Sequence, residues 1–122
     1  MTFSRLHVSK ATTNRLKALK SRTGLTPNII CRLALCYSLA DPHAVDPKSH
    51  DAAGMEFLRS TVLGEYEELY IALARQRLSD DSSDISIDEA IRAHINRGVE
   101  LLSPRLKSIA DVADLLPRGN SH

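Results

Sequence analysis

The chain has 122 residues, of which 43% are apolar, 25% charged and 4% aromatic. This length supplies one hydrophobic core but not two, so we expect a single domain over residues 1–122. The formal net charge of +1 points to no class of partner. No apolar run approaches the roughly 18 residues of a membrane span, and the N-terminus lacks the hydrophobic stretch of a signal peptide, which predicts a cytoplasmic protein without membrane contact.

The charges are distributed unevenly. Residues 1–40 hold seven bases and no acid, whereas residues 41–122 hold nine bases and fifteen acids. The first part therefore carries +7 and the second −6. The seven bases are Arg5, Lys10, Arg15, Lys17, Lys20, Arg22 and Arg32. Such a group attracts phosphate, although an ordinary solvated surface balanced by acids elsewhere would have the same composition.

The composition favours a mainly helical fold, because Leu, Ala, Ile and Arg are frequent and long alternating stretches are absent. Cys31 and Cys36 lie five residues apart in an apolar segment. On a helix they would point roughly 140° apart, which prevents a disulfide between them. We interpret both as buried free thiols.

The chain begins with its one predicted strand, residues 3–8. Alternation places Arg5 and His7 on one side, together with Phe3, and Leu6 and Val8 on the other.

A first helix is predicted from Lys10 to about Thr23, with Ser9 as its N-cap and Gly24 as its end. One stripe of this helix is expected to pack against the rest of the protein, and the opposite side to be solvent-exposed and cationic. The packed stripe consists of Thr12, Leu16, Leu19 and Thr23, and the solvent-exposed side of Lys10, Asn14, Lys17 and Ser21.

A second helix is predicted to begin after Thr26 as N-cap, with Pro27 in its first turn, and to end at Ala40. Apart from its first turn, only Arg32 and Ser38 interrupt its apolar surface. A helix that is apolar nearly all round must be buried nearly all round, which is difficult within so small a chain. The sequence therefore predicts self-association.

Residues 54–116 are expected to form a helical part that follows the basic part, residues 1–40, after a surface connection over residues 41–53. Its first helix should run from Met55 to Leu78.

Two further helices complete the predicted helical part. Ser86 and Glu89 form a capping box ahead of a helix that ends at Leu102. Ser103 and Pro104 predict a short last helix to about residue 116.

The order of strand, basic helix, glycine turn and capped helix is that of the ribbon-helix-helix arrangement, in which two chains pair their strands. The turn around Gly24 makes Thr26 a candidate phosphate contact at a helix N-terminus. Arg5 and His7 would face a DNA groove if the strand reads bases, or the rim of a subunit interface if it is an oligomer contact.

No pattern indicates catalysis, a metal or a cofactor. His94 has no cysteine, serine or carboxylate at a spacing that identifies a catalytic partner, so we interpret it as structural. Asp80, Asp81 and Asp84 do not fit a calcium-binding loop. The sequence also lacks a phosphate-binding loop, a dinucleotide fingerprint and a Cys/His zinc pattern. We expect a protein that is not an enzyme.

Several segments match a known family. They are Ser9-Lys10-Ala11, Leu16-Lys17, Leu19-Lys20, the run from Arg22 to Arg32, and the run from Ala93 to Leu102. Together they resemble the DndE family of the DNA phosphorothioation (DNA sulfur modification) system, and the segment Arg22-Thr23-Gly24-Leu25-Thr26-Pro27-Asn28 is the most specific.

The resemblance implies a role in replacing a non-bridging phosphate oxygen of DNA by sulfur, alongside a cysteine desulfurase, an iron–sulfur ATP-pyrophosphatase-like protein and an ATPase. It also implies a tetramer that binds duplex DNA, with a preference for nicked DNA, through surface lysines. Lys10, Lys17 and Lys20 occupy the family's basic positions, and Arg15 and Arg22 are further candidates.

Our main hypothesis is therefore a non-enzymatic DNA-binding subunit of this machinery. Two alternatives remain open. One is a ribbon-helix-helix repressor that contacts a palindromic site through Arg5. The other is a scaffold whose acidic segments, residues 65–68 and 80–89, dock the larger modification proteins. The sequence does not decide between a dimer and a tetramer.

Overall fold

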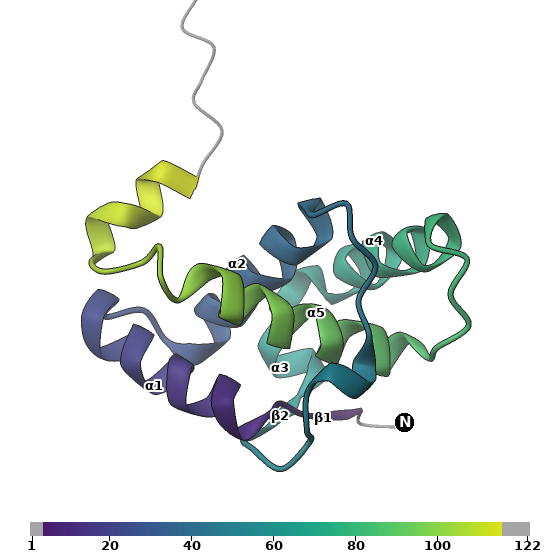
Figure 1. Cartoon of the computed structure of the whole chain (residues 1–122), viewed down its shortest axis with the longest axis horizontal. Helices are drawn as coiled ribbons and strands as arrows, with labels where there is room; N and C mark the ends of the chain where they lie inside the picture. The colour runs from purple at the N-terminus through teal and green to yellow at the C-terminus, as the bar shows by residue number, and fades with distance from the viewer. Residues whose placement is uncertain (1–3, 116–122) are drawn as a thin grey trace, which may run out of the picture.

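The computed structural model describes residues 4–115, which form five α-helices, three short 3-10 helices and a two-stranded sheet (Figure 1). In chain order the elements are β1 (Arg5–His7), α1 (Lys10–Thr23), α2 (Pro27–Ala40), η1 (Pro47–Ser49), β2 (Glu56–Leu58), α3 (Arg59–Leu63), η2 (Gly64–Tyr66), α4 (Glu67–Asp80), α5 (Ile87–Leu102) and η3 (Ile109–Leu115).

Helix α1 forms as its sequence predicts. The Ser9 hydroxyl oxygen accepts a hydrogen bond from the Thr12 backbone N–H at 2.9 Å. Gly24 ends the helix in the left-handed conformation, with φ of 76°, which glycine adopts without a steric cost. The buried residues of α1 are the four predicted ones, Thr12, Leu16, Leu19 and Thr23. The remaining sides of α1 face outward.

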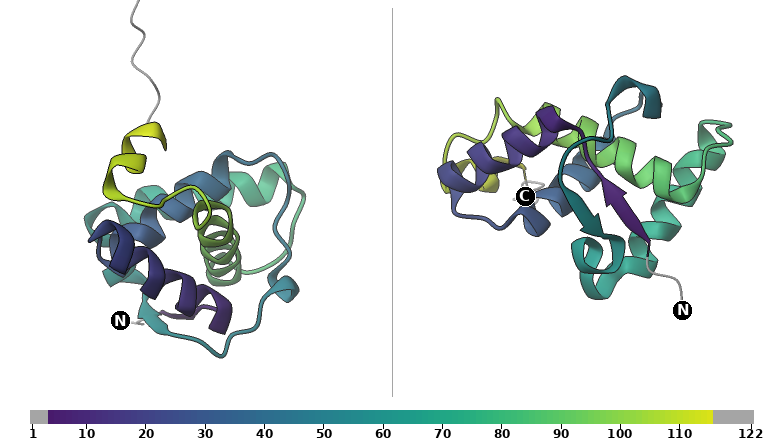
Figure 2. Two further views of the ribbon diagram at one scale, coloured as in Figure 1. Left: turned by 60° about the vertical axis from the view of Figure 1, so that its left-hand side comes forward. Right: turned by 90° about the horizontal axis from the view of Figure 1, so that it is seen from below.

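Helix α2 begins at the predicted N-cap, where the Thr26 hydroxyl accepts the Ile29 N–H at 3.4 Å. It packs most extensively against α5, and Figure 2 (left) shows α5 almost end-on among the other helices. Cys31 is buried, but Cys36 is exposed, so the prediction of two buried thiols was wrong for Cys36. Because the two residues point to different sides of the helix, burying one leaves the other outside.

Strand β1 pairs antiparallel with β2 of the same chain, with Leu6 opposite Phe57, and Figure 2 (right) shows the two arrows side by side. Leu6 and Val8 are buried and Arg5 is exposed, as alternation predicts, while Phe3 lies outside the described residues. The ribbon-helix-helix arrangement pairs this strand with that of a second chain. The structure does not confirm that arrangement, because the partner strand comes from residues 56–58.

The predicted helix from Met55 to Leu78 was wrong. That stretch contains β2, α3, η2 and α4, and the helical path breaks at Gly64, where φ is 65°. The break turns α4 away from the axis of α3, so the apolar spacing that suggested one helix does not give one buried stripe. Val62 is buried, whereas Leu69 is 56% exposed.

Helix α5 lies at the centre of the fold. The predicted N-cap is present, because the Ser86 hydroxyl accepts the Glu89 N–H at 3.2 Å. The Glu89 carboxylate accepts from the Ser86 hydroxyl at 3.2 Å rather than from the Ser86 backbone N–H that a capping box uses. The fully buried large side chains of α5 are Ile91, His94, Ile95 and Leu102.

After α5, the helix predicted to start at Ser103 and Pro104 was wrong. The chain makes a turn there and then forms η3, and the predicted end at residue 116 lies outside the described residues. No helix within residues 4–115 is long and apolar enough to cross a bilayer.

Candidate nucleic-acid interface

Three lysines lie on the outer sides of α1. Lys10, Lys17 and Lys20 are exposed, and within residues 4–115 none of them forms an ion pair. At a rise of about 1.5 Å per residue, Lys10 and Lys20 are roughly 15 Å apart along the axis. These ammonium groups are therefore available to phosphates along the backbone of a nucleic acid.

The N-terminus of α1 already has a carboxylate partner. Asp51 Oδ1 accepts the backbone N–H of Ala53 at 3.0 Å and of Lys10 at 3.1 Å. These backbone hydrogen bonds lower the pKa of Asp51 below its ordinary value, with that from Ala53 first. The first turn of α1 is thus occupied by a carboxylate, whereas the three lysine side chains carry no ion-pair partner in the described residues.

Arg15 and Arg22 flank the lysines on the opposite edge of the exposed surface. Arg15 is half-buried, whereas Arg22 is exposed. One nitrogen of Arg22, Nη2, donates to the backbone oxygen of Ser103 at 3.3 Å and to its hydroxyl at 3.4 Å. Arg22 therefore joins the end of α1 to the segment that follows α5.

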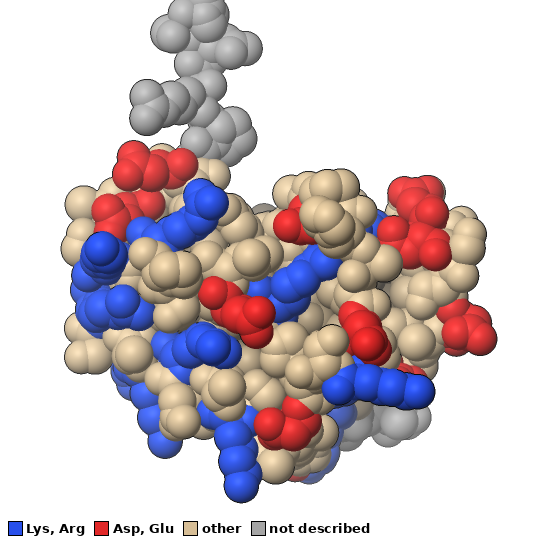
Figure 3. All heavy atoms as spheres, in the orientation of Figure 1, with Lys and Arg blue, Asp and Glu red and all other residues tan. Residues whose placement is uncertain are grey.

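That segment adds two cations that the sequence reasoning missed. Arg105 and Lys107 are exposed, and η3, which follows them, packs against α1. The Arg105 guanidinium lies 5.7 Å from the centre of the Tyr37 ring, a cation–π contact that holds it in place. Figure 3 shows Lys and Arg gathered over the side formed by α1 and this segment. We call α1 together with residues 103–107 the basic surface.

Arg5 and His7 both contact Glu56 on β2. Arg5 Nη1 forms an ion pair with Glu56 Oε1, and His7 Nε2 lies 2.9 Å from Oε2. The hydrogen bond from Arg5 is the largest influence that lowers the pKa of Glu56. Because Arg5 is opposite Leu58 in the ladder, this is a diagonal cross-strand pair. The structure thus gives Arg5 a partner within the chain, which neither sequence interpretation foresaw.

Thr26 is exposed beside the end of α1, as the turn predicts. Its hydroxyl oxygen caps α2, and its O–H remains a donor that a phosphate oxygen could accept.

A family model described as "DNA sulphur modification protein DndE" matches residues 5–110. The chain belongs to the DndE family. No curated protein matches the chain.

Two solved DndE structures share its fold. DndE from Escherichia coli B7A, described as involved in DNA phosphorothioation modification, is 28% identical with a TM-score of 0.70, and the match covers 84% of this chain and 98% of that chain. A DndE mutant with glycine-to-lysine replacements, described as involved in DNA phosphorothioation, is 25% identical with a TM-score of 0.67. That match covers 84% of this chain and 99% of the mutant chain.

His94 of this DndE-family chain has a polar partner inside the fold. His94 is 1% exposed, and its Nδ1 lies 2.8 Å from the Ser38 hydroxyl, which also accepts from Arg97 Nε at 2.8 Å. Ser38 can donate its hydroxyl proton to Nδ1 while it accepts from Arg97, an arrangement compatible with a neutral ring protonated on Nε2. Burial, followed by the charges of Arg97 and Arg77, lowers the pKa of His94 to about 4. His94 is therefore a buried, neutral side chain of the core.

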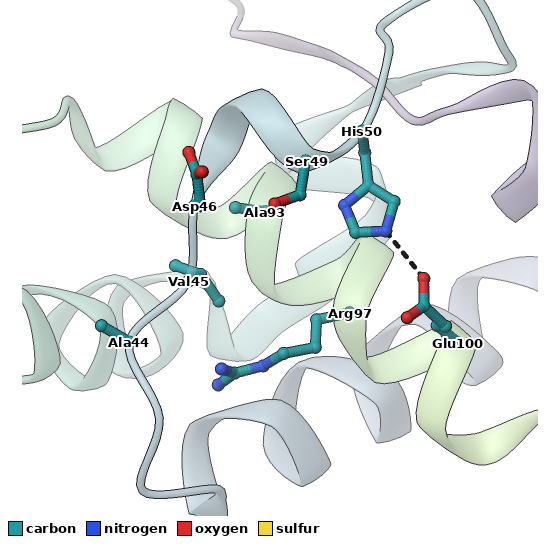
Figure 4. A pocket seen from close by; sticks show the side chains of 8 residues that line it. All are labelled: Ala44, Val45, Asp46, Ser49, His50, Ala93, Arg97 and Glu100. Atoms are coloured by element: carbon teal, nitrogen blue, oxygen red, sulfur yellow. Dashed lines mark hydrogen bonds and ion pairs between the residues drawn. The ribbon is translucent and has the colours of Figure 1, made fainter.

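A pocket of about 200 Å³ lies between α5 and the connection from Ala44 to His50 (Figure 4). His50 Nε2 and Glu100 Oε2 are 3.0 Å apart across it. Arg92 Nη2 of α5 donates to the Pro47 backbone oxygen at 2.9 Å. These contacts attach the connection to α5. Within residues 4–115, no three His, Cys, Asp or Glu side chains come together in a way that could hold a metal ion.

Proposed function

We propose that this DndE-family chain acts in DNA phosphorothioation as a cytoplasmic DNA-binding subunit without catalytic activity of its own. It binds duplex DNA, and nicked duplex in preference, through Lys10, Lys17 and Lys20, with Arg15, Arg22 and Thr26 in support. The observation that carries the proposal is the exposure of the three lysines without ion-pair partners in the described part of the chain.

Lysine contacts to phosphate hold a protein on the DNA backbone without reading its sequence. That property suits a subunit whose partner proteins modify the backbone itself. A nicked duplex bends more easily than an intact one, so its two arms can both approach the lysines on a convex helical surface.

The proposal includes an oligomer, a tetramer in the first instance, because several copies would present several basic surfaces to one duplex. It also includes the cysteine desulfurase, the iron–sulfur ATP-pyrophosphatase-like protein and the ATPase of the system as the proteins with which the subunit works. These supply the sulfur and the energy, so the described residues of this chain need only hold the substrate.

The test is a competition between nicked duplex, intact duplex of random sequence and palindromic duplexes for the full-length protein. The proposal expects nicked DNA to compete best and all intact sequences to compete alike. Lys10→Ala/Lys17→Ala/Lys20→Ala should weaken binding to every duplex, and Arg5→Ala should change little, because Arg5 is paired with Glu56. Preference for one palindrome, lost on Arg5→Ala, would overturn the proposal in favour of a repressor.

A further inference from the structure

Helix α4 exposes large apolar side chains that the fold leaves uncovered. Tyr66 just before it is 60% exposed, Leu69 56% and Leu73 45%. A groove of about 260 Å³ between α4 and α2 begins at Leu73, and Cys36 and Leu39 of α2 form its other wall. We call Tyr66, Leu69, Leu73 and this groove the α4 face.

The spacing of the α4 face is that of a helix-recognition surface. Positions 66, 69 and 73 follow the i, i+3, i+7 pattern, which places them in one stripe along the helix. Single exposed apolar side chains are common on protein surfaces, whereas a row beside a groove marks a site that another chain covers. The side of α4 opposite this stripe packs on the core through Ala74, which is fully buried, and through the partly buried Tyr70 and Ile71.

Acidic side chains border the α4 face at both ends. Glu65 and Glu68 are exposed near Tyr66, and Asp80 is exposed at the far end of the groove. The cation in the groove wall, Arg77, is neutralised by Asp81 at 2.9 Å. Figure 3 shows Asp and Glu gathered at the end of the molecule formed by α4 and the loop after it. The exposed carboxylates of this region, Glu65, Glu68 and Asp80, outnumber its one exposed cation in the described residues, Arg75.

A second copy of this chain fits the α4 face poorly. Two α4 faces packed symmetrically would bring Glu65, Glu68 and Asp80 against the same acids of the other copy, and like charges across an interface are costly. The basic surface of a second copy has the opposite charge, but no exposed large apolar side chain of the described residues lies on α1. Neither arrangement matches both the apolar row and its acidic border.

We propose that the α4 face docks another protein through an amphipathic helix whose apolar side chains are flanked by Lys and Arg. Apolar side chains of that helix would cover Leu69 and Leu73 and fill the groove, and its cations would lie opposite Glu65, Glu68 and Asp80. Helices α1 and α4 lie toward opposite ends of the long axis (Figures 1 and 2), so DNA and this partner can bind together. The proposal adds to the proposed function and does not depend on it.

The experiment uses a fluorescein-labelled helical peptide of about 18 residues, built from Leu, Lys and Ala with leucines at i, i+3, i+7 spacing. Fluorescence anisotropy with the full-length protein measures its affinity. Leu69→Ala/Leu73→Ala should weaken binding about tenfold or more, because truncating central anchors removes most of the affinity of an interface. Ile109→Ala is the matched control: this residue is 53% exposed but lies on η3, and binding should be unchanged.

Two companion peptides separate shape from charge. Replacing every Lys by Glu, or every Leu by Ala, should each abolish measurable binding. A Leu-free peptide that binds as well as the first, or an affinity that Leu69→Ala/Leu73→Ala leaves unchanged, would overturn the proposal. Sedimentation equilibrium provides the last check, since self-association that Leu69→Ala/Leu73→Ala abolishes would assign the face to a second copy. Leu69→Ala/Leu73→Ala should leave the affinity for nicked duplex unchanged, and the triple lysine variant should keep its affinity for the peptide. Peptide binding and DNA binding therefore test the two proposals independently.

Discussion

The substitution Gly98→Ala tests the packing of the two central helices. In an isolated helix alanine is favoured over glycine by about 1 kcal/mol. Here the added Cβ would lie 1.9 Å from the Ala34 carbonyl oxygen and 2.4 Å from its carbon. Both atoms belong to the backbone of α2, so no side chain can rotate away and the helices must separate.

Overpacking of this kind costs about 1–3 kcal/mol, and it disturbs the most extensive contact of the fold. Since the gain in helix propensity offsets about 1 kcal/mol of this cost, we expect Gly98→Ala to lower the free energy of unfolding by up to about 2 kcal/mol, measured by urea denaturation with circular dichroism. Ala18→Gly, at an exposed position of α1, calibrates helix propensity and should destabilise by about 1 kcal/mol. If Gly98→Ala were instead stabilising, the close approach of α2 and α5 would be refuted.

Two further predictions concern buried titratable groups. Unfolded His94 takes up a proton near pH 6.5, but burial lowers its folded pKa to about 4, so the unfolded state binds more protons between these values. The free energy of unfolding should therefore fall by up to about 3 kcal/mol as the pH drops through this range, and His94→Asn should remove most of that dependence; an unchanged pH slope in urea titrations would contradict it. Burial raises the pKa of Cys31 to about 12, whereas Cys36 is exposed, so an aromatic disulfide reagent should modify one thiol per native chain and two in denaturant. Rapid modification of both thiols in the native protein, or of any thiol in native Cys36→Ser, would be inconsistent with the structure.

The elements with strong local signals were predictable from the sequence. Helix α1 begins after Ser9 and ends at Gly24, α2 begins after Thr26, and α5 begins after Ser86. These boundaries were predictable because a cap depends on residues within one turn of it.

The errors fall where distant residues decide the structure. β2 forms because β1, about fifty residues earlier, pairs with it, and no local pattern at Phe57 reveals that partner. Gly64 lies inside an apolar spacing that continues on both sides of it, so the spacing alone suggested one helix.

The candidate interface was predictable only in part. The charge count located the basic segment, and the family resemblance singled out Lys10, Lys17 and Lys20. The ion pair of Arg5 with Glu56 depends on strand pairing, so it could not be foreseen. Arg105 joined the basic surface only once the segment after α5 lay against α1, because in the sequence it lies far from the residues of α1.

The salt dependence of nicked-duplex binding tests the central claim most directly. Each phosphate contact by a lysine contributes a slope of about 0.9 to the plot of log affinity against log salt concentration. Lys10→Ala/Lys17→Ala/Lys20→Ala should therefore flatten the slope by about 2–3, while Arg75→Ala, which removes an exposed cation from α4, should leave it unchanged. An identical slope and affinity for the wild type and the triple variant would contradict DNA binding through the basic surface.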